Sequence, residues 1–488
     1  MTRPLRRVTL VMLAIFAVLI ANACYVQVVE AKKLRNDPHN GRQLVDRYRR
    51  ERGPILASDA EISRSIATKD ALRYLRLYPD KELYAAVTGY YSQFGSTGIE
   101  RTYDDILSGE DSRLLVDRLT RLLTGRGSQG GSVSLSLAPA VQKAAAAALG
   151  NRKGAVVAIE PSTGRILAMV SSPSYDPNPF ASHDGSVVAS YSDKLNADPN
   201  QPLVNRATSR RYPPGSLFKL VTSAAALSTG QYKPDTVIPS PTKLKLPLTN
   251  RYLSNFGGEV CGDGTNTTLI DALRISCNTA FAGLGLKLGE SALRKQARAF
   301  GIGNAFGFDI PFSSSIFPDR LDQPQTALSA IGQYDVSLTP LQAAMIVSAI
   351  ANHGILMKPR LVDALRKPDL TVLSRPHDEQ LSVAMSSEVA TMLTQMMLAV
   401  VQSGTGVAAQ IPGVAVAGKT GTAQHATNKP PHVWFGGFAP ADNPRVAVAV
   451  LIEDGGGSGT EATGGVLAAP VAKAVMRAAL ALPVGPAR

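Results

Sequence analysis

Histidine, cysteine and tryptophan are scarce in this chain, and the scarcity excludes some kinds of site. The 488 residues include six histidines, three cysteines and one tryptophan. With so few histidines and no Gly-x-Ser-x-Gly elbow, a Ser-His-Asp hydrolase is disfavoured. Two loop cysteines without a nearby histidine pair do not have the spacing of a zinc site. We therefore expect no metal and no cofactor.

Acidic side chains are also in the minority. There are 51 lysines and arginines against 38 aspartates and glutamates, a formal net charge of +13. The basic residues are neither interleaved with base-stacking aromatics nor set in a known reader motif, so we expect no nucleic-acid partner. A basic surface also suits anionic lipids and acidic wall polymers, and this is our interpretation.

Long apolar runs are absent except at the N-terminus. A basic segment, residues 1–7, precedes an apolar run at residues 8–29. As a helix this run would span about 33 Å, enough to cross a bilayer core. We predict an uncleaved signal-anchor. The alternative is a signal peptide cut after the A-x-A-like Ala21–Ala23, but the apolar character continues past that point.

Three short motifs stand in order along the rest of the chain: Ser216–Lys219, Ser276–Asn278 and Lys419–Gly421. Each is weak alone, because a serine and a lysine three apart recur by chance. On a helix, however, residues i and i+3 are neighbours, which would put the first hydroxyl beside an amine. Together the motifs contain the parts of an acyl-transfer site that needs no histidine.

Acyl transfer needs a nucleophile, a base and hydrogen-bond donors that stabilise the oxyanion. We predict Ser216 as the nucleophile and Lys219 as the base, its pKa lowered by burial and by the neighbouring cation of Lys419. Ser276 would bridge Lys219 and the leaving nitrogen. Asn278 would hold the amide of the bound acyl chain.

The third motif offers groups that would bind substrate. Lys419, Thr420 and Thr422 suit a substrate carboxylate, and Gly421 lets a substrate backbone approach closely. We predict that a helix begins at Ser216, so its backbone N–H has no intrahelical partner and would form the oxyanion hole. The backbone N–H of Thr422 would complete it.

Two cysteines lie outside the apolar run, Cys261 and Cys277. Outside the membrane such a pair can form a disulfide, worth about 3 kcal/mol for a loop of this length in the chain-entropy model. Two buried thiols are the alternative. Because Cys277 belongs to the second motif, a bond would brace that motif.

The order of predicted elements indicates an α+β fold behind a separate N-terminal module. Residues 30–130 form this module, with helical patterns near 81–94 and 111–123, and the glycine-rich tract 125–132 is a linker. In residues 131–488, helical patterns lie between strand signals and a last helix follows at 467–481. The predicted strands are 155–160, 165–171, 414–423, 432–439 and 445–453. The short final connections favour an antiparallel sheet, flanked by helices with an inserted helical lobe.

A phosphate-binding loop is a competing interpretation of Gly413–Thr420, which satisfies the P-loop pattern. Such a loop must follow a strand and open a helix. Here the residues between the two glycines are predicted to form a strand instead of a loop. The prolines in Asn428–Pro431 prevent the long helix that should follow. We reject this interpretation.

Several further segments resemble recurring blocks of the class B penicillin-binding proteins, most closely their actinobacterial A type. The resemblance covers nearly the whole chain. The segments are Arg52–Ile55, Thr97–Glu100 with Tyr103, Pro173–Asn178, Asn205–Ala207, Gly332–Gln333, Thr339–Leu341 and Gly418–Gln424.

The resemblance implies a penicillin-binding/transpeptidase fold, similar to serine β-lactamases, on a small pedestal at residues 30–130. It implies a single-pass membrane protein whose extracytoplasmic D,D-transpeptidase domain, residues 131–488, cross-links peptidoglycan stem peptides. Ser216 would attack the penultimate D-Ala, release the last D-Ala and pass the acyl group to an amine acceptor. β-Lactams would acylate the same serine. The implied partners are a SEDS-type glycosyltransferase and divisome proteins.

Two other functions remain open on this fold. A carboxypeptidase or β-lactamase would hydrolyse the acyl-enzyme, but we see no acidic residue in an obvious deacylation motif, and a β-lactamase needs neither anchor nor pedestal. A catalytically silent sensor would bind wall fragments or antibiotic without turnover. Labelled penicillin and Ser216→Ala distinguish these from a transferase.

Overall fold

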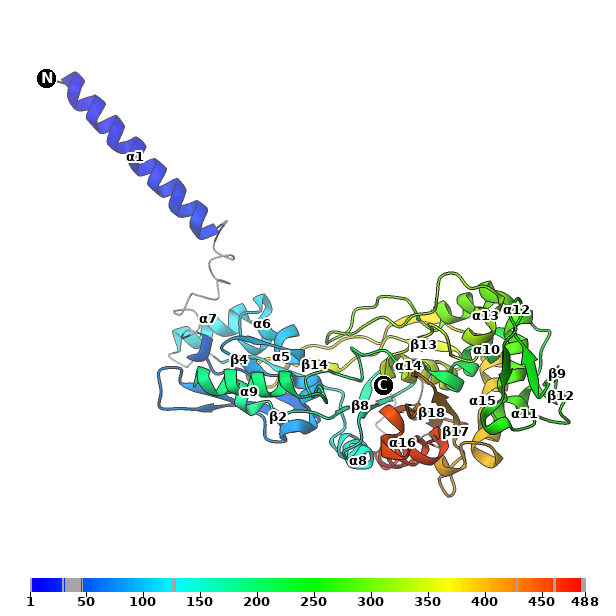
Figure 1. Ribbon diagram of the computed structural model, residues 1–488. Coiled ribbons are helices and arrows are strands. Elements are labelled where there is room, and N and C mark those ends of the chain that lie inside the picture. The colour runs from blue at the N-terminus through cyan, green and yellow to red at the C-terminus, as the bar shows by residue number, and fades with distance from the viewer. Residues whose placement is uncertain are drawn as a thin grey trace.

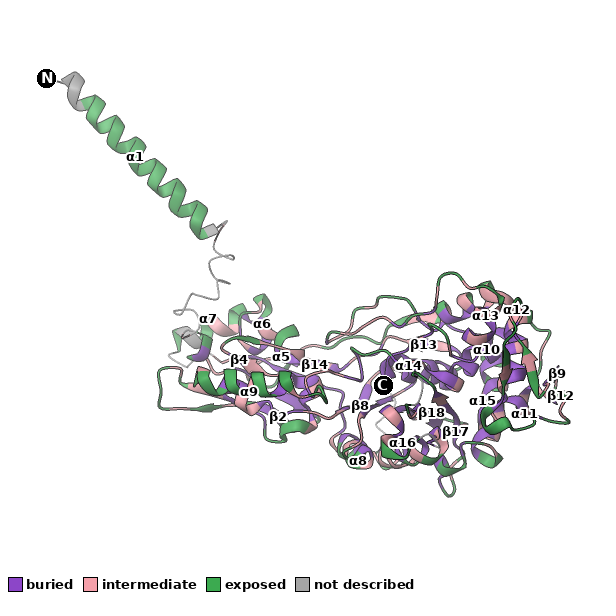
Figure 2. Ribbon diagram, viewed as in Figure 1, coloured by how far each residue is buried: buried purple, intermediate pink, exposed green. Residues whose placement is uncertain are grey.

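The computed structural model describes residues 2–28, 30, 45, 47–124, 129–426, 429–459 and 462–483. Helix α1 (Thr2–Val28) stands apart from a folded body with two parts, the smaller at the left of Figure 1 and the larger at the right. Within α1, Arg6–Gln27 is long and apolar enough to cross a membrane, and it is exposed (Figure 2). This segment overlaps the predicted span, residues 8–29.

A five-stranded antiparallel sheet lies at the centre of the larger part. Its order is β17-β18-β19-β7-β8. The strands are β7 (Gly154–Ile159), β8 (Ile166–Ser172), β17 (Ala417–Ala423), β18 (His432–Ala439) and β19 (Val446–Ile452). Every residue of β18 and β19 is buried, as expected for strands covered on both faces. The predicted antiparallel sheet from distant parts of the chain is confirmed.

Helices cover both faces of this sheet. Helices α8 (Pro139–Leu149) and α16 (Gly464–Leu480) pack on one face, and α14 (Pro340–Ala351) packs on the other. Successive strand residues point to opposite faces, so Val156 joins the cluster under α16 and Val157 joins the cluster under α14.

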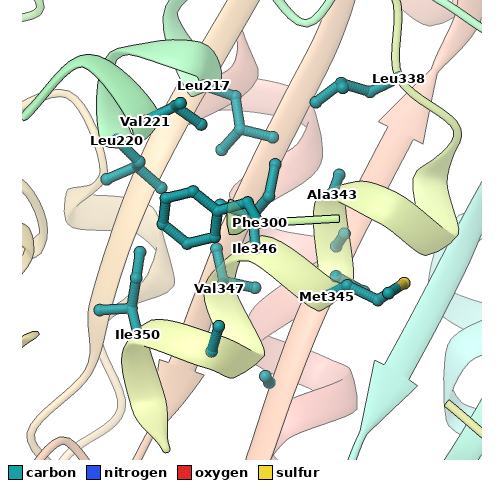
Figure 3. Close-up of a cluster of buried hydrophobic side chains, with 14 of the residues drawn as sticks. Leu217, Leu220, Val221, Phe300, Leu338, Ala343, Met345, Ile346, Val347 and Ile350 are labelled. Carbon is teal, nitrogen blue, oxygen red and sulfur yellow. The ribbon is translucent and has the colours of Figure 1, made fainter. Parts of the chain in front are cut away.

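The helical lobe lies at the right of Figure 1 and packs against α14. Its helices are α10 (Lys219–Leu227), α11 (Leu269–Arg274), α12 (Asn278–Ala299), α13 (Gln323–Ser329) and α15 (Ser387–Ser403). Figure 3 shows the ring of Phe300 between Leu220 of α10 and the side chains of Ile346 and Ile350 of α14, all members of one buried cluster. Each such buried side chain stabilises the fold by about 1.5–3 kcal/mol. The packing therefore fixes the position of α10, the helix that follows the first motif.

Shorter elements surround these layers. In the lobe and around it lie β9 (Val237–Pro239), β10 (Lys243–Lys245), β11 (Tyr252–Ser254), β12 (Asn266–Thr268), β13 (Ile355–Met357) and β16 (Gln380–Val383). Helix α9 (Gly185–Ala197) packs with η3 (Asn178–Ala181) beside the smaller part.

The smaller part is built on a six-stranded sheet with the order β15-β14-β6-β1-β2-β3. Its strands are β1 (Ile55–Ala57), β2 (Ala60–Ala67), β3 (Tyr74–Leu77), β6 (Ser132–Leu135), β14 (Val362–Arg366) and β15 (Val372–Ser374). Strands β14 and β15 come from far along the chain. The predicted division near residue 130 did not foresee that the chain returns to complete this sheet.

The remaining elements of the smaller part are short. They are η1 (Lys81–Leu83), α4 (Ala85–Thr88), β4 (Tyr91–Ser92), β5 (Gly95–Ser96), α5 (Gly98–Thr102), α6 (Asp104–Leu107), η2 (Ser112–Leu114) and α7 (Leu115–Leu123). The helix expected near 81–94 ends early, because Gly89 (φ +65°) turns the chain into a hairpin. The helix expected near 111–123 is present. Of the predicted linker, residues 125–128 lie outside the described part.

Candidate active site

Ser216 lies on a tight turn at the start of a buried helix. The first motif begins as a 3-10 turn, η4 (Gly215–Phe218), and becomes α-helical only from Lys219, three residues later than predicted. Ser216 is half-buried. Within the described part of the chain its hydroxyl has no hydrogen-bond partner. The hydroxyl is therefore available to a reacting group.

Strand β17 lies directly against this turn. A Cβ atom added to Gly421 would lie 2.8 Å from the carbonyl oxygen of Pro214, and one added to Gly215 would lie 2.4 Å from that of Thr422. The indole Nε1 of Trp434, on the next strand, donates a 3.0 Å hydrogen bond to the carbonyl of Pro213. The first and third motifs are therefore in contact, although about two hundred positions separate them.

The second motif joins them through two buried lysines. The Lys219 Nζ atom is 2.6 Å from the carbonyl oxygen of Ser276, 3.2 Å from its Oγ and 2.7 Å from Oδ1 of Asn278. The Lys419 Nζ atom donates to the same Ser276 Oγ at 2.8 Å and to the carbonyl of Thr420 at 3.0 Å. Both lysines are 0% exposed. Among the described residues neither makes an ion pair with a carboxylate.

The burial of these amines changes their protonation. Burial, and secondly the cation of Lys419, hold the pKa of Lys219 well below its ordinary value. Burial lowers the pKa of Lys419 to about 7. A neutral Lys219 has two N–H groups for Ser276 O and Asn278 Oδ1, and a lone pair that can accept the Ser276 hydroxyl proton. The contacts of Lys219 therefore suit a neutral amine with a proton relay at Ser276.

The backbone around Ser276 is held by its neighbours. Ser276 has a φ of +64°, which is uncommon for a residue with a side chain. Asn255 Oδ1 accepts hydrogen bonds from the backbone N–H groups of Asn278 (2.8 Å) and Thr279 (3.0 Å), the first of α12. The sulfur atoms of Cys261 and Cys277 are bonded to each other. Sequence reasoning missed Asn255, which stands in no motif.

The groups predicted for a substrate carboxylate differ in their exposure. Lys419 and Thr420 are buried, and Thr420 Oγ1 lies 2.6 Å from Oγ1 of Thr405, a residue that the sequence did not single out. Thr422 is half-buried. Of these three side chains, that of Thr422 is therefore the one that is partly open, whereas those of Lys419 and Thr420 are enclosed. Gly421 is buried against the turn of Ser216, so the need for glycine there comes from packing rather than from room for substrate.

All residues predicted for the site thus meet at one place, where β17 lies beside the turn of η4 and the first turn of α12. The arrangement offers a free hydroxyl, a buried amine of low pKa, a second hydroxyl that contacts both amines, and backbone N–H groups at the turn. These are the components that acylation and deacylation of a serine require.

Two family models match the chain. The one described as penicillin binding protein transpeptidase domain matches residues 154–477, and the one described as penicillin binding protein A dimerisation domain matches residues 52–133.

Similar proteins are known in mycobacteria. The peptidoglycan D,D-transpeptidase PbpA of Mycolicibacterium smegmatis is 46% identical over 98% of this chain and 99% of that protein. Its Mycobacterium tuberculosis H37Rv counterpart is 45% identical with the same coverage. The structure of penicillin-binding protein A from M. tuberculosis as a ceftriaxone acyl-enzyme complex covers 90% of this chain and 100% of that chain, with 44% identity and a TM-score of 0.86.

Proposed function

The chain belongs to the penicillin-binding protein transpeptidase family, and from this membership and the site we infer that it is a peptidoglycan D,D-transpeptidase with Ser216 as nucleophile. The observation that carries the assignment is the Ser276 hydroxyl, which lies within hydrogen-bond distance of both Lys219 and Lys419. This contact links the three motifs into one proton-transfer unit beside a free serine.

In the acylation step, neutral Lys219 takes the Ser216 proton while Oγ attacks the carbonyl carbon of the penultimate D-Ala of a stem peptide. The backbone N–H groups of Ser216 and Thr422 hold the oxyanion. When the C–N bond breaks, Lys219 returns its proton through Ser276 to the departing amine of the terminal D-Ala. The low pKa of Lys219 supports its role as the base at neutral pH.

In the transfer step, an amine of a second stem peptide attacks the ester on Ser216. The amine loses a proton to Lys219, the ester C–O bond breaks, and Ser216 recovers its hydrogen. The product is a cross-linked peptide. Asn278 holds the acyl chain through its amide. Before acylation, Thr422 contacts the carboxylate of the donor's terminal D-Ala, with the charge of Lys419 behind it. β-Lactams acylate the same serine because they resemble the acyl donor.

The chain is further proposed to have four segments: a cytoplasmic segment (1–7), a membrane anchor (8–29), a pedestal (30–130) and an extracytoplasmic catalytic domain (131–488). The apolar, exposed helix α1 supports the anchor. At the membrane the enzyme works beside divisome proteins and a SEDS-type glycosyltransferase. The glycosyltransferase supplies the new glycan strands.

The test is a transfer assay with the full chain in detergent, a pentapeptide donor ending in D-Ala-D-Ala and an amine acceptor. We expect one D-Ala released for each cross-linked product, and neither product with Ser216→Ala. Ser228→Ala, an exposed serine just beyond the same helix, is the matched control and should remain active. D-Ala release without cross-linking would indicate a carboxypeptidase, and normal turnover by Ser216→Ala would exclude the assignment.

A further inference from the structure

Two histidines and an aspartate meet beside the catalytic strand, at a place that the proposed function does not use. His425 lies in the loop after β17, His432 is the first residue of β18, and Asp454 lies in the turn η7 (Glu453–Gly457) after β19. One possible ligand atom from each lies within 4.8 Å of the other two. Their spacing in sequence fits no metal motif, which explains why sequence reasoning predicted no metal.

We propose that His425, His432 and Asp454 bind a divalent transition-metal ion, with Zn²⁺ as the best match. The Asp454 Oδ1 atom lies 3.0 Å from Nε2 of His425 and 3.8 Å from Nδ1 of His432. Two donors that each lie about 2.0–2.1 Å from a tetrahedral Zn²⁺ are about 3.4 Å apart. The two measured separations bracket this value, and two imidazoles with one carboxylate are a donor set that Zn²⁺ accepts.

The carboxylate oxygen of Asp454 that faces the histidines is shielded. Its Oδ1 atom is closed off from solvent, and Nε2 of His425 lies 3.0 Å away without a well-aligned hydrogen bond. A carboxylate oxygen in such a place is costly unless a proton or a cation satisfies it. Asp454 also adopts a φ of +49°, followed by Gly455 at +61°, a backbone conformation that turns its side chain toward the two histidines.

The histidine rings are placed for binding but must adjust. The ring of His432 is buried and packs edge-on against Tyr212 at 5.3 Å between centroids, while its Nδ1 accepts the backbone N–H of Asp454 at 3.2 Å. The rings of His425 and His432 are stacked at 3.9 Å. A metal lies in the plane of each ring, so the exposed His425 must rotate out of the stack and the metal replaces the backbone hydrogen bond of His432.

Metal binding would join the β17–β18 connection, which holds both histidines, to the turn after β19. The β17–β18 connection begins just beyond Thr422, and Asp454 follows Glu453, which accepts hydrogen bonds from Arg206 and from Tyr212, four residues before Ser216. Three protein ligands leave a fourth position for water. The expected consequence is slower exchange of the backbone amides at Gln424–Ala426 when the metal is bound.

The test is calorimetric titration of the full chain in detergent with Zn²⁺, after treatment with a chelator. We expect one Zn²⁺ per chain. His425→Ala and Asp454→Asn should each weaken binding more than about 100-fold, because each changes a residue that binds the metal, and loss of a group that only orients a ligand already costs about 10–100-fold. Asparagine tolerates the left-handed backbone of position 454, so this variant removes the charge and keeps the turn.

A matched control is available elsewhere on the chain. His183 and Asp70 form another histidine–aspartate pair, with 2.6 Å between Nδ1 and Oδ2, and His183→Ala should leave Zn²⁺ affinity unchanged. Thermal melting of each variant checks that the fold is retained. The proposal is overturned if the unaltered chain binds no Zn²⁺, if either cluster variant retains full affinity, or if His183→Ala loses as much. If Zn²⁺ leaves the rate of amide exchange at residues 424–426 unchanged, the metal does not join the two connections.

Discussion

At the scale of the residue, two lysines of the site are buried and have no acidic partner within the described part of the chain. Lys219 and Lys419 are both fully buried and share the hydroxyl of Ser276. Two ammonium groups in such a place repel each other and lose their hydration, so the neutral form of one is favoured. The sequence pattern identified both lysines, but only the fold shows that a serine joins them.

Lys219 can be tested by removing its ability to become neutral. We expect Lys219→Ala and Lys219→Arg each to slow acylation by labelled penicillin by about 10²–10⁴-fold, the range for loss of a general base. The arginine variant keeps the charge but stays protonated, so it should not restore the rate. Lys233→Arg, at an exposed lysine, is the control. Near-normal acylation by Lys219→Arg would show that no neutral amine is needed.

The pH dependence of acylation tests the interaction between the two lysines. The base is active when neutral, so the rate rises with pH through the pKa of Lys219 and levels off well below pH 10.5. Lys419 lowers that pKa by its charge, so Lys419→Met should move the rising limb to higher pH as well as reduce the maximum rate. Lys243→Met, at an exposed lysine, should not move it. If the rise of the acylation rate in Lys419→Met occurs at the same pH or at lower pH, Lys419 does not lower the pKa of Lys219.

The residues that support the site show where sequence reasoning fails. Ser216, Lys219 and Ser276 could be recognised because the chemistry requires these residue types at fixed spacing. Asn255 and Thr405 could not, because the hydrogen bonds that each makes depend on where a distant segment lies. Many sites on a chain can supply an amide or hydroxyl, and no local pattern selects among them.

At the scale of the element, the contact between β17 and the turn of Ser216 sets the geometry of the site. Glycines at 215 and 421 permit backbone to approach backbone there. The sequence predicted a strand at 414–423, but it did not predict this contact. The pattern gives the identity of a strand, but its neighbours are decided by packing across the whole sheet.

A methyl group at position 421 tests that contact. In Gly421→Ala the new Cβ would meet the carbonyl oxygen of Pro214 at 2.8 Å and Cβ of Trp434 at 2.9 Å, so turn and strand must separate. We expect acylation to slow at least about 100-fold, as small displacements of reacting groups do. Gly283→Ala, in α12 with no atom within 4 Å of the new Cβ, should be as active as the unaltered chain. Equal rates for the two variants would refute the role of this contact.

At the scale of the whole molecule, the smaller part and the catalytic part share a sheet. Strand β14 lies beside β6 in the six-stranded sheet, although more than two hundred residues separate them. Sequence reasoning recognised two modules from composition and turns. It could not find the returning strands, because a short strand of mixed polarity carries no sign of its partner.

Replacing a buried carboxylate of the smaller part tests whether the two parts unfold together. Glu100 lies between the guanidinium groups of Arg52 and Arg76, at 2.7 Å from each Nε, and all three residues are buried. Glu100→Gln should cost about 3–5 kcal/mol, because buried Arg76 loses its carboxylate partner and buried Arg52 keeps only that of Asp104. The single tryptophan, Trp434, lies in the catalytic sheet and reports its unfolding by fluorescence. We expect its denaturant midpoint to fall in Glu100→Gln.

An exposed carboxylate is the control for that experiment. Glu61 is half-exposed and 3.7 Å from Arg64, so Glu61→Gln should change stability by less than about 1 kcal/mol. If Glu100→Gln leaves the Trp434 transition in place, the two parts unfold separately and the shared sheet does not couple them.

Mass spectrometry of the full chain after treatment with penicillin tests directly whether Ser216 is the nucleophile. We expect one long-lived adduct per chain, on the peptide that contains Ser216, and none in Ser216→Ala. An adduct on another residue, or an adduct that hydrolyses as fast as it forms, would contradict a transpeptidase built on Ser216.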